Sequence, residues 1–161
     1  MSGADLETRL RRIEDDVAIR DLAARFSDCA NERDFEAFRG LWTPDAVWEM
    51  GPPLPSRAEG VDAIVELLRK LLTPQRMFLQ MTHSGVIDFD GPDRATARFV
   101  ERERAKGEHG FYENLAVYFD EAVRTPSGWR FRRRRYDYRN LDTSPFAGEV
   151  FFSQTGGEAR P

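Results

Sequence analysis

The chain has 161 residues, of which 40% are hydrophobic and 32% are charged, a composition typical of one globular domain. Its net charge of −4 argues against nucleic acid and against an anionic membrane surface as partners. The single cysteine, Cys29, excludes an internal disulfide. The charged N-terminal segment lacks the apolar core of a secretory signal, and no run approaches the roughly 20 apolar residues that span a bilayer. We therefore expect a cytoplasmic protein.

The first half of the chain has the apolar spacing of helices. Apolar residues recur every three or four positions over residues 5–31, which predicts a long helix. A short second helix is predicted over residues 34–41, with Asp34 as its N-cap, and a third over residues 59–74. The apolar stripes of the first and third helices are Leu6, Leu10, Ile13, Val17, Leu22 and Phe26, and Val61, Ile64, Val65, Leu68 and Leu72.

The second half changes to the period of β-strands. After a short strand at residues 46–50, strands are predicted over residues 84–90, 94–106, 111–125 and 129–141, joined by tight turns. Helices followed by an antiparallel meander predict an α+β fold, in which a curved antiparallel sheet wraps three N-terminal helices and leaves a conical pocket. We expect one domain over residues 1–150 and a loose tail over residues 151–161.

Alternation along the strands predicts which side chains face inward. In the strand at 94–106, Phe99 shares a face with Glu101 and Glu103, and in the strand at 129–141, Phe131 shares a face with Arg135 and Arg139. A pocket with an apolar base and a polar mouth would result, which is typical of a small-molecule site. A partly solvated lattice of cross-strand ion pairs is the alternative. The basic run FRRRR splits between two faces and therefore does not predict a nucleic-acid site.

Several segments together resemble a known family. They are RDFEAFRGLWTPDAVWEM, GVDAIVELLRKLL, MTHSGVIDFDGPDRATARF and GWRFRRRRYDYRNL, in this order and spacing. Over about residues 10–146 the chain resembles the SnoaL-like branch of the nuclear transport factor 2-like superfamily. The resemblance implies a cone-shaped α+β fold. The dehydratase-type members of this branch include scytalone dehydratase, bile acid 7α-dehydratase and hexachlorocyclohexane dehydrochlorinase.

The resemblance also implies a catalytic arrangement without a cofactor. The dehydratase-type members use a histidine on the first long strand, oriented by an aspartate on the first helix, to remove a proton next to a leaving group. His83 matches the histidine and Arg139 matches an arginine near the end of the last strand. Asn31 stands at the position of the aspartate, and Phe26 at the position of a tyrosine.

Asn31 would weaken such a mechanism. An amide can select the tautomer of a histidine, but it cannot stabilise the imidazolium that forms. Asp28, Glu101 and Glu103 are carboxylates that could reach His83 instead, and the sequence does not choose among them. Two distant histidines and one cysteine offer no ligand spacing for a metal. The expected substrate-binding residues are Phe26, Trp48, Met50, Phe99, Glu101, Tyr112, Tyr138 and Phe146.

Two functions of different classes remain open at this point. The first is a cofactor-independent lyase or isomerase acting on a small, mostly apolar cyclic substrate such as a polyketide, a steroid or an aromatic catabolite, with His83, Asn31 and Arg139 as catalytic residues. The second is a non-catalytic ligand-binding or protein-interaction module, and a small subunit of a ring-hydroxylating oxygenase is a weaker third. An exposed sheet face rich in tyrosine and arginine predicts a homodimer.

Overall fold

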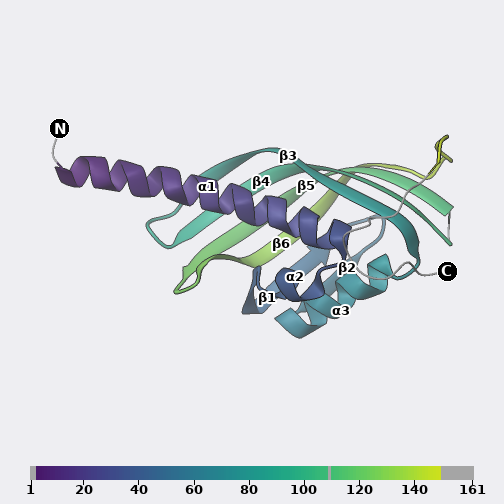
Figure 1. Ribbon diagram of the computed structural model, residues 1–161, viewed down its shortest axis with the longest axis horizontal. Helices are drawn as coiled ribbons and strands as arrows, with labels where there is room; N and C mark the ends of the chain where they lie inside the picture. Colours follow the sequence, from purple (N-terminus) through teal and green to yellow (C-terminus); the bar gives the residue numbers. More distant parts are fainter. Residues whose placement is uncertain (1–2, 109, 150–161) are drawn as a thin grey trace.

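The computed structural model describes residues 3–108 and 110–149, which form three helices and one six-stranded sheet. The expected tail at residues 151–161 and His109 lie outside the described residues. The elements are α1 (Gly3–Glu32), α2 (Phe35–Arg39), β1 (Trp42–Met50), β2 (Ser56–Glu59), α3 (Val61–Leu72), β3 (Gln75–Phe89), β4 (Arg94–Gly107), β5 (Gly110–Thr125) and β6 (Gly128–Asp142) (Figure 1).

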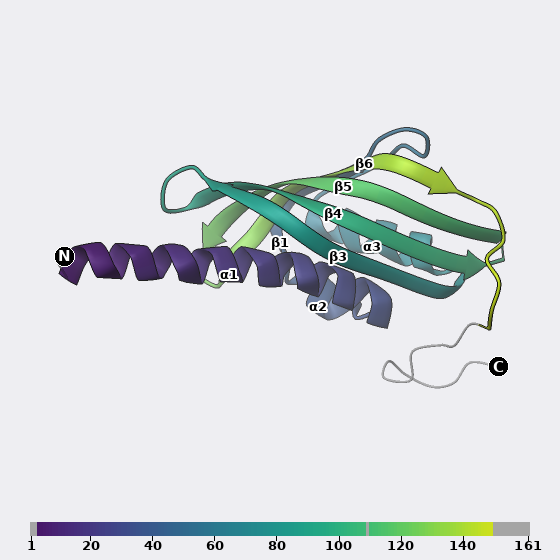
Figure 2. The ribbon, with the colours of Figure 1, turned by 90° about the horizontal axis from the view of Figure 1, so that it is seen from above.

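The sheet has the strand order β2-β1-β6-β5-β4-β3. The long strands β3 to β6 form an antiparallel meander, whereas β1 pairs with β6 in parallel. The sheet curves over α1, while α2 and α3 lie beside β1 and β2 (Figures 1 and 2). The expected α+β cone is confirmed, with one parallel pair that the sequence did not predict.

Three strand predictions need correction. Strand β1 begins at Trp42 and not at residue 46, strand β3 begins at Gln75 and not at residue 84, and the four-residue strand β2 was missed. Met77, Phe78 and Leu79 are consecutive apolar residues, so this part of β3 shows no period of two. The predicted N-cap is confirmed, because the Asp34 side chain accepts a hydrogen bond of 2.9 Å from the backbone N–H of Ala37.

Register shifts in β3 and β6 mark β-bulges. On β3 the pairing with β4 passes from Thr82 to Gly85, so the segment between them carries an extra residue. On β6 the pairing with β5 skips Arg132 and Arg139. Each bulge inverts the alternation of the side chains that follow it. As a result Tyr136 and Tyr138 are more buried than Arg135 and Arg139, which are exposed, contrary to the predicted face of this strand.

The core is an aromatic cluster centred on Phe26. Its ring centroid lies 5.0 Å from that of Phe38, 5.6 Å from that of Trp48 and 5.4 Å from that of Tyr118. Tilted and edge-to-face contacts of this kind add about 0.5–1.5 kcal/mol each to the gain from burial. Phe26 thus packs the C-terminal part of α1 against β1 and β5.

The first turns of α1 extend beyond the sheet (Figure 2). Four residues of the predicted apolar stripe are exposed in the N-terminal half of this helix: Leu6 by 58%, Leu10 by 53%, Ile13 by 62% and Val17 by 60%. The prediction that the stripe is buried along its whole length is therefore wrong. Burial begins at Asp15, which accepts hydrogen bonds from Arg124 (2.6 Å) and from the Trp129 indole (3.0 Å).

Asn31 fastens the other end of α1 to β3. Its Nδ2 donates to the carbonyl of Gln80 (2.9 Å), and its Oδ1 accepts from the N–H of the same residue (2.7 Å). Both ends of the amide are therefore used by the backbone of Gln80. An aspartate could accept from the N–H but would face the carbonyl without a proton to donate.

We expect Asn31→Asp to lower the free energy of unfolding by about 1–3 kcal/mol, because it leaves a partly buried carbonyl opposite a carboxylate. Urea denaturation at neutral pH measures this loss. The matched control is Asp28→Asn, a change at an exposed position of the same helix. Equal stability of the wild type and Asn31→Asp would show that the Gln80 contacts contribute nothing.

Candidate functional site

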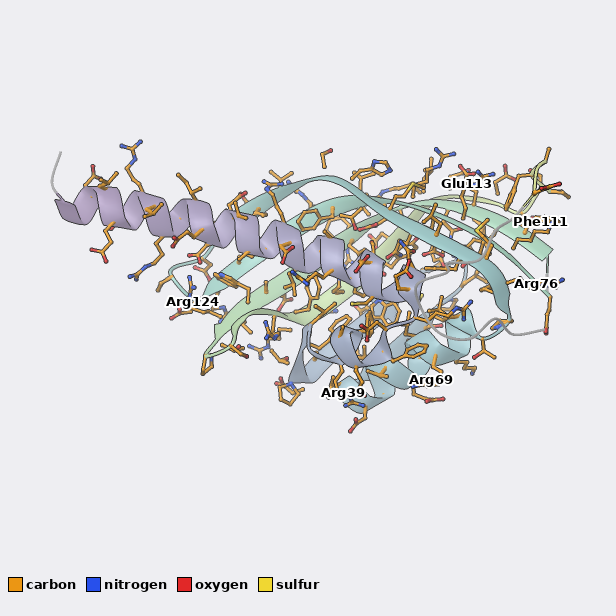
Figure 3. The ribbon with its side chains drawn as sticks, viewed as in Figure 1. Arg39, Arg69, Arg76, Phe111, Glu113 and Arg124 are labelled. Carbon is orange, nitrogen blue, oxygen red and sulfur yellow. The ribbon has the colours of Figure 1, made fainter. Side chains whose placement is uncertain are left out.

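A cavity of about 630 Å³ lies between the sheet, α1 and α3. Its size suits a small cyclic molecule. Phe111 belongs to this cavity, and Figure 3 places it at the end of the sheet opposite Arg124, which pairs with α1. The lining residues are Phe26, Ala30, Trp48, Met50, Leu54, Ser56, Leu67, Leu68, Lys70, Leu71, Leu72, Pro74, Gln75, Phe78, Gln80, Glu103, Phe111, Tyr112, Asn114, Tyr118, Tyr136, Tyr138, Leu141 and Thr143.

Five of the expected substrate-binding residues line this cavity, namely Phe26, Trp48, Met50, Tyr112 and Tyr138.

The other three expected residues do not line it. Phe99 and Glu101 are buried below it, with exposed fractions of 2% and 0%. Phe146 packs edge-to-face on Phe111, with ring centroids 5.2 Å apart, and so supports the cavity wall from outside.

The three residues expected to be catalytic are not brought together. His83 lies at the bulge of β3 and is exposed, and Arg139 lies at a bulge of β6 and is exposed. Strands β3 and β6 are separated by β4 and β5. Asn31 has both ends of its amide on the Gln80 backbone. Since none of the three lines the cavity, the structure does not support the arrangement that the resemblance implied.

Glu103 is the carboxylate on the cavity wall. It accepts hydrogen bonds from Gln80 Nε2 (2.9 Å) and Asn114 Nδ2 (3.4 Å), and the Tyr112 hydroxyl lies close to it. Burial raises the pKa of Glu103, while the polar groups of Tyr112, Gln80 and Asn114 oppose the rise. A carboxylate in this position can act as a general base nearer to neutral pH than a solvated one.

Tyrosines from β5 and β6 form the opposite wall. Burial raises the pKa of Tyr112 and Tyr136 far above the usual range, and that of Tyr138 to about 12. These phenols therefore keep their protons at neutral pH and can donate hydrogen bonds.

Three buried polar atoms without partners belong to residues that line this same cavity. The Tyr136 phenol lies near Asn114, and the Trp48 indole near Tyr118, but neither pair has the geometry of a hydrogen bond. Within the described residues, Tyr136 Oη, Asn114 Oδ1 and Trp48 Nε1 have no hydrogen-bond partner. Because buried polar groups are nearly always satisfied, these atoms mark where a polar ligand group or water would bind.

A buried ion pair lies beneath the cavity. Arg134, with an exposed fraction of 0%, donates from Nε (2.8 Å) and Nη2 (3.1 Å) to the two oxygens of Asp120. Its guanidinium also lies 3.8 Å from the ring centroid of Tyr118 and 4.2 Å from that of Phe26. Arg134 is thus held by the pair and by the aromatic rings on either side.

Glu101 lies close to this pair without joining it. No hydrogen bond or ion pair links Arg134 to Glu101 within the described residues. The Glu101 carboxyl contacts Thr82 Oγ1 at 2.9 and 3.1 Å. Burial raises the pKa of Glu101 to about 8, although the nearby Arg134 charge and the Thr82 contact oppose the rise.

Several residues that line the cavity were not predicted from the sequence, above all Gln80, Asn114, Tyr118 and Tyr136. Tyr118 and Asn114 follow the alternation of β5 and could have been found from it. Tyr136 was assigned to the outer face because the bulge at Arg132 was not predicted. Gln80 lies in the part of β3 that was not recognised as a strand.

The described residues, 3–108 and 110–149, offer neither a metal-binding cluster nor a membrane-spanning helix. They contain no cluster of three His, Cys, Asp or Glu side chains that could hold a metal ion. They also contain no helix that is both long and apolar enough to cross a membrane.

The comparisons with known proteins agree with this architecture. The model of the SnoaL-like domain family matches residues 11–135, so the chain belongs to this family. No curated protein matches the sequence significantly.

Similar solved structures share the fold. Hexachlorocyclohexane dehydrochlorinase LinA type 2 superposes with a TM-score of 0.79 at 19% identity, covering 91% of this chain and 99% of that one. A provisionally assigned scytalone dehydratase from Novosphingobium aromaticivorans gives a TM-score of 0.75 at 20% identity, covering 92% and 98%. An NTF2-like protein with a cystatin-like fold, also from Novosphingobium aromaticivorans, gives 0.74 at 27% identity, covering 86% and 91%.

We expect Arg134→Met to destabilise the protein by about 3–5 kcal/mol, because it leaves Asp120 charged and buried without its partner. The double change Arg134→Met with Asp120→Leu should recover much of this loss, since it removes both charges. Urea denaturation measures both values. Arg135→Met, at an exposed position on the same strand, is the control and should change stability by less than about 1 kcal/mol.

Proposed function

We propose that the protein is a cofactor-independent lyase or isomerase, of the dehydratase type, that acts on a small and mostly apolar cyclic substrate in this cavity. The observation that carries the proposal is a hydrogen-bonded carboxylate, Glu103, on a cavity lined by residues of which three polar atoms, Tyr136 Oη, Asn114 Oδ1 and Trp48 Nε1, lack partners within the described residues. The similarity of the fold to a dehydrochlorinase and to a provisionally assigned dehydratase supports the same class of reaction.

In this proposal Glu103 is the general base. It removes a proton from the carbon next to a substrate carbonyl, and the electron pair moves onto the carbonyl oxygen. The Tyr136 phenol and the Trp48 indole N–H, which lack hydrogen-bond partners among residues 3–108 and 110–149, donate hydrogen bonds to the oxygen that becomes negative. Collapse of this enolate forms the carbon–carbon double bond and expels the leaving group. In an isomerisation the proton returns from Glu103 to another carbon.

The exposed positions of His83 and Arg139 favour Glu103 as the general base. His83 and Arg139 are exposed and outside the cavity, so neither can reach a substrate held there without a large rearrangement. Because Arg139 lies outside the cavity, it cannot pair with a carboxylate of a substrate held there. We therefore propose uncharged hydroxy ketones and related cyclic compounds as substrates, rather than carboxylic acids.

The alternative is a non-catalytic binding module that uses the same cavity. Its support is that Asn31 and Phe26 stand where the resemblance places an aspartate and a tyrosine, and that both are occupied structurally. Such a module would bind the same compounds without converting them.

We expect Glu103→Gln to reduce turnover by about 10²–10⁴-fold, because an amide cannot accept a proton. A panel of cyclic β-hydroxy ketones, steroids and aromatic polyketides, followed by mass spectrometry for loss of water or for isomerisation, would find the substrate. His83→Ala is the matched control and should keep wild-type activity, since His83 is exposed. Loss of activity in His83→Ala with retention in Glu103→Gln would contradict the assignment.

We also propose a homodimer formed through the outer face of the sheet. This face exposes Val100 and Leu115 by 45% and 42%, beside both signs of charge in the Arg102–Glu113 pair. Sedimentation equilibrium should give twice the mass of 18.6 kDa, and Val100→Glu should give the single mass. Single-chain mass for the wild type would exclude the dimer.

A further inference from the structure

A continuous run of hydrogen bonds joins the buried floor to the cavity wall. Thr82 Oγ1 contacts both oxygens of Glu101, at 2.9 and 3.1 Å, and lies 2.7 Å from Ser27 Oγ. Ser27 Oγ lies 3.1 Å from Gln80 Oε1, and Gln80 Nε2 donates to Glu103 at 2.9 Å. Ser27 is on α1, Thr82 and Gln80 are on β3, and the two carboxyl groups are on β4.

The number of protons on these side chains determines which group is the donor in each hydrogen bond of this run. Gln80 donates to Glu103 from its only donor atom, so its carbonyl oxygen must accept from Ser27. The Ser27 hydroxyl has one proton and donates it to Gln80. In the 2.7 Å contact between Ser27 Oγ and Thr82 Oγ1, Thr82 must therefore be the donor. Thr82 then has no proton left for Glu101. The short contact between Thr82 and Glu101 is therefore a hydrogen bond only if Glu101 carries the proton.

The opposite protonation, with the proton on Glu103 and the charge on Glu101, gives the charged carboxylate fewer hydrogen-bond donors. If Glu103 held the proton and Glu101 were ionised, the Gln80 amide would have to turn round, and Thr82 would be the one donor to the Glu101 charge. Glu103 has two donors, Gln80 and Asn114, and the Tyr112 hydroxyl lies close to it as well. A buried negative charge is more stable where more N–H and O–H groups point at it. The negative charge therefore belongs on Glu103 and the proton on Glu101.

The surroundings of Glu101 favour the same assignment. The charged groups that face it are Arg134 on β6, Asp120 on β5 and Glu103 on its own strand. The Arg134 guanidinium is already engaged in two hydrogen bonds with Asp120. Strand β3 faces Glu101 with the hydroxyl of Thr82, behind which Ser27 and the Ala23 carbonyl of α1 lie. Burial under these conditions raises the pKa of Glu101 to about 8.

We propose that neutral Glu101 is a positioning residue, which donates through Thr82 and Ser27 to fix the Gln80 amide with its N–H toward Glu103 and so keeps Glu103 the ionised acceptor of the cavity. This inference deepens the proposed function, because Glu103 is the base there. It concerns protonation and orientation alone, so it also holds for a cavity that only binds ligand. Ionisation of Glu101 would take its proton from the run and release Gln80.

Carbon-13 NMR of glutamate side-chain carboxyl groups, titrated from pH 4 to pH 10, tests the proposal without a substrate. Glu101→Gln and Glu103→Gln identify the two resonances by their loss. We expect the Glu101 carboxyl to remain protonated at pH 7 in the wild type. Ser27→Ala should raise the midpoint of Glu103 by about 1 pH unit, because Gln80 loses the partner that orients it.

Two controls separate positioning from general damage. Ser84→Ala, at an exposed serine next to the bulge, should leave the midpoint of Glu103 unchanged. Glu101→Gln should also leave it unchanged, because the new amide can donate to Thr82 in place of the carboxyl proton. Ionisation of Glu101 near the usual value of about 4, or an unchanged Glu103 midpoint in Ser27→Ala, would overturn the proposal.

Stability provides a second readout. A glutamate with a pKa of about 8 in the folded state, and an ordinary value when unfolded, binds more protons when folded throughout the interval between these two values. Its contribution to stability is complete below the unfolded value and is lost as the pH rises through 8. The wild type should thus lose stability relative to Glu101→Gln by roughly 1000-fold in the unfolding equilibrium constant between pH 5 and pH 9. Parallel pH profiles for the two proteins would contradict a neutral Glu101.

Discussion

A sheet of long strands can wrap a helix only where its strands bend, and in this protein β-bulges supply the bends. Strands β3 to β6 contain 15, 14, 16 and 15 residues. The bulges at residues 82–85 of β3 and at Arg132 and Arg139 of β6 re-aim the side chains that follow them. They turn Tyr136 and Tyr138 inward, so the wall of the cavity consists of phenols and not of guanidinium groups.

This geometry sets the electrostatics of the interior. Arg134 is buried but engaged by Asp120, and the neighbouring arginines of β6 point to solvent, where Arg133 and Arg135 pair with Glu49 and Asp137. The carboxyl groups of Glu101 and Glu103 therefore depend on hydrogen-bond donors rather than on a cation. Donors gather around one of them, so the part of the cavity wall that the sheet forms combines one carboxylate with several phenols.

The sequence was sufficient for the architecture because periodicity reports burial over long segments. All three helices, the four long strands and the inward face of β4 were predicted from the spacing of apolar residues. The expected site failed where a period of two does not hold. Arg139 and Tyr136 were exchanged between faces by bulges, which depend on tertiary curvature and have no signature in β6.

The observed places of His83 and Asn31 differ from the expected ones for a related reason. The resemblance implied a role for His83 in the pocket, but His83 lies at the bulge of β3 and is exposed, whereas Thr82 is partly buried. Asn31 was expected to serve a side chain and instead serves the backbone of Gln80. Sequence patterns identify a buried amide without identifying which groups it satisfies.

The exposed N-terminal part of α1 affects the order in which parts of the protein unfold. Isolated helical segments of this length are marginal in water, and most helices in proteins are stabilised by the surface that they bury. With Leu6, Leu10, Ile13 and Val17 exposed, the segment before Asp15 buries little apolar surface, although Arg12 stacks on Phe89 of β3 with its guanidinium 3.6 Å from the ring centroid. Its amide protons should exchange with solvent through local fraying, whereas those after Ile19 should exchange only when the sheet itself unfolds.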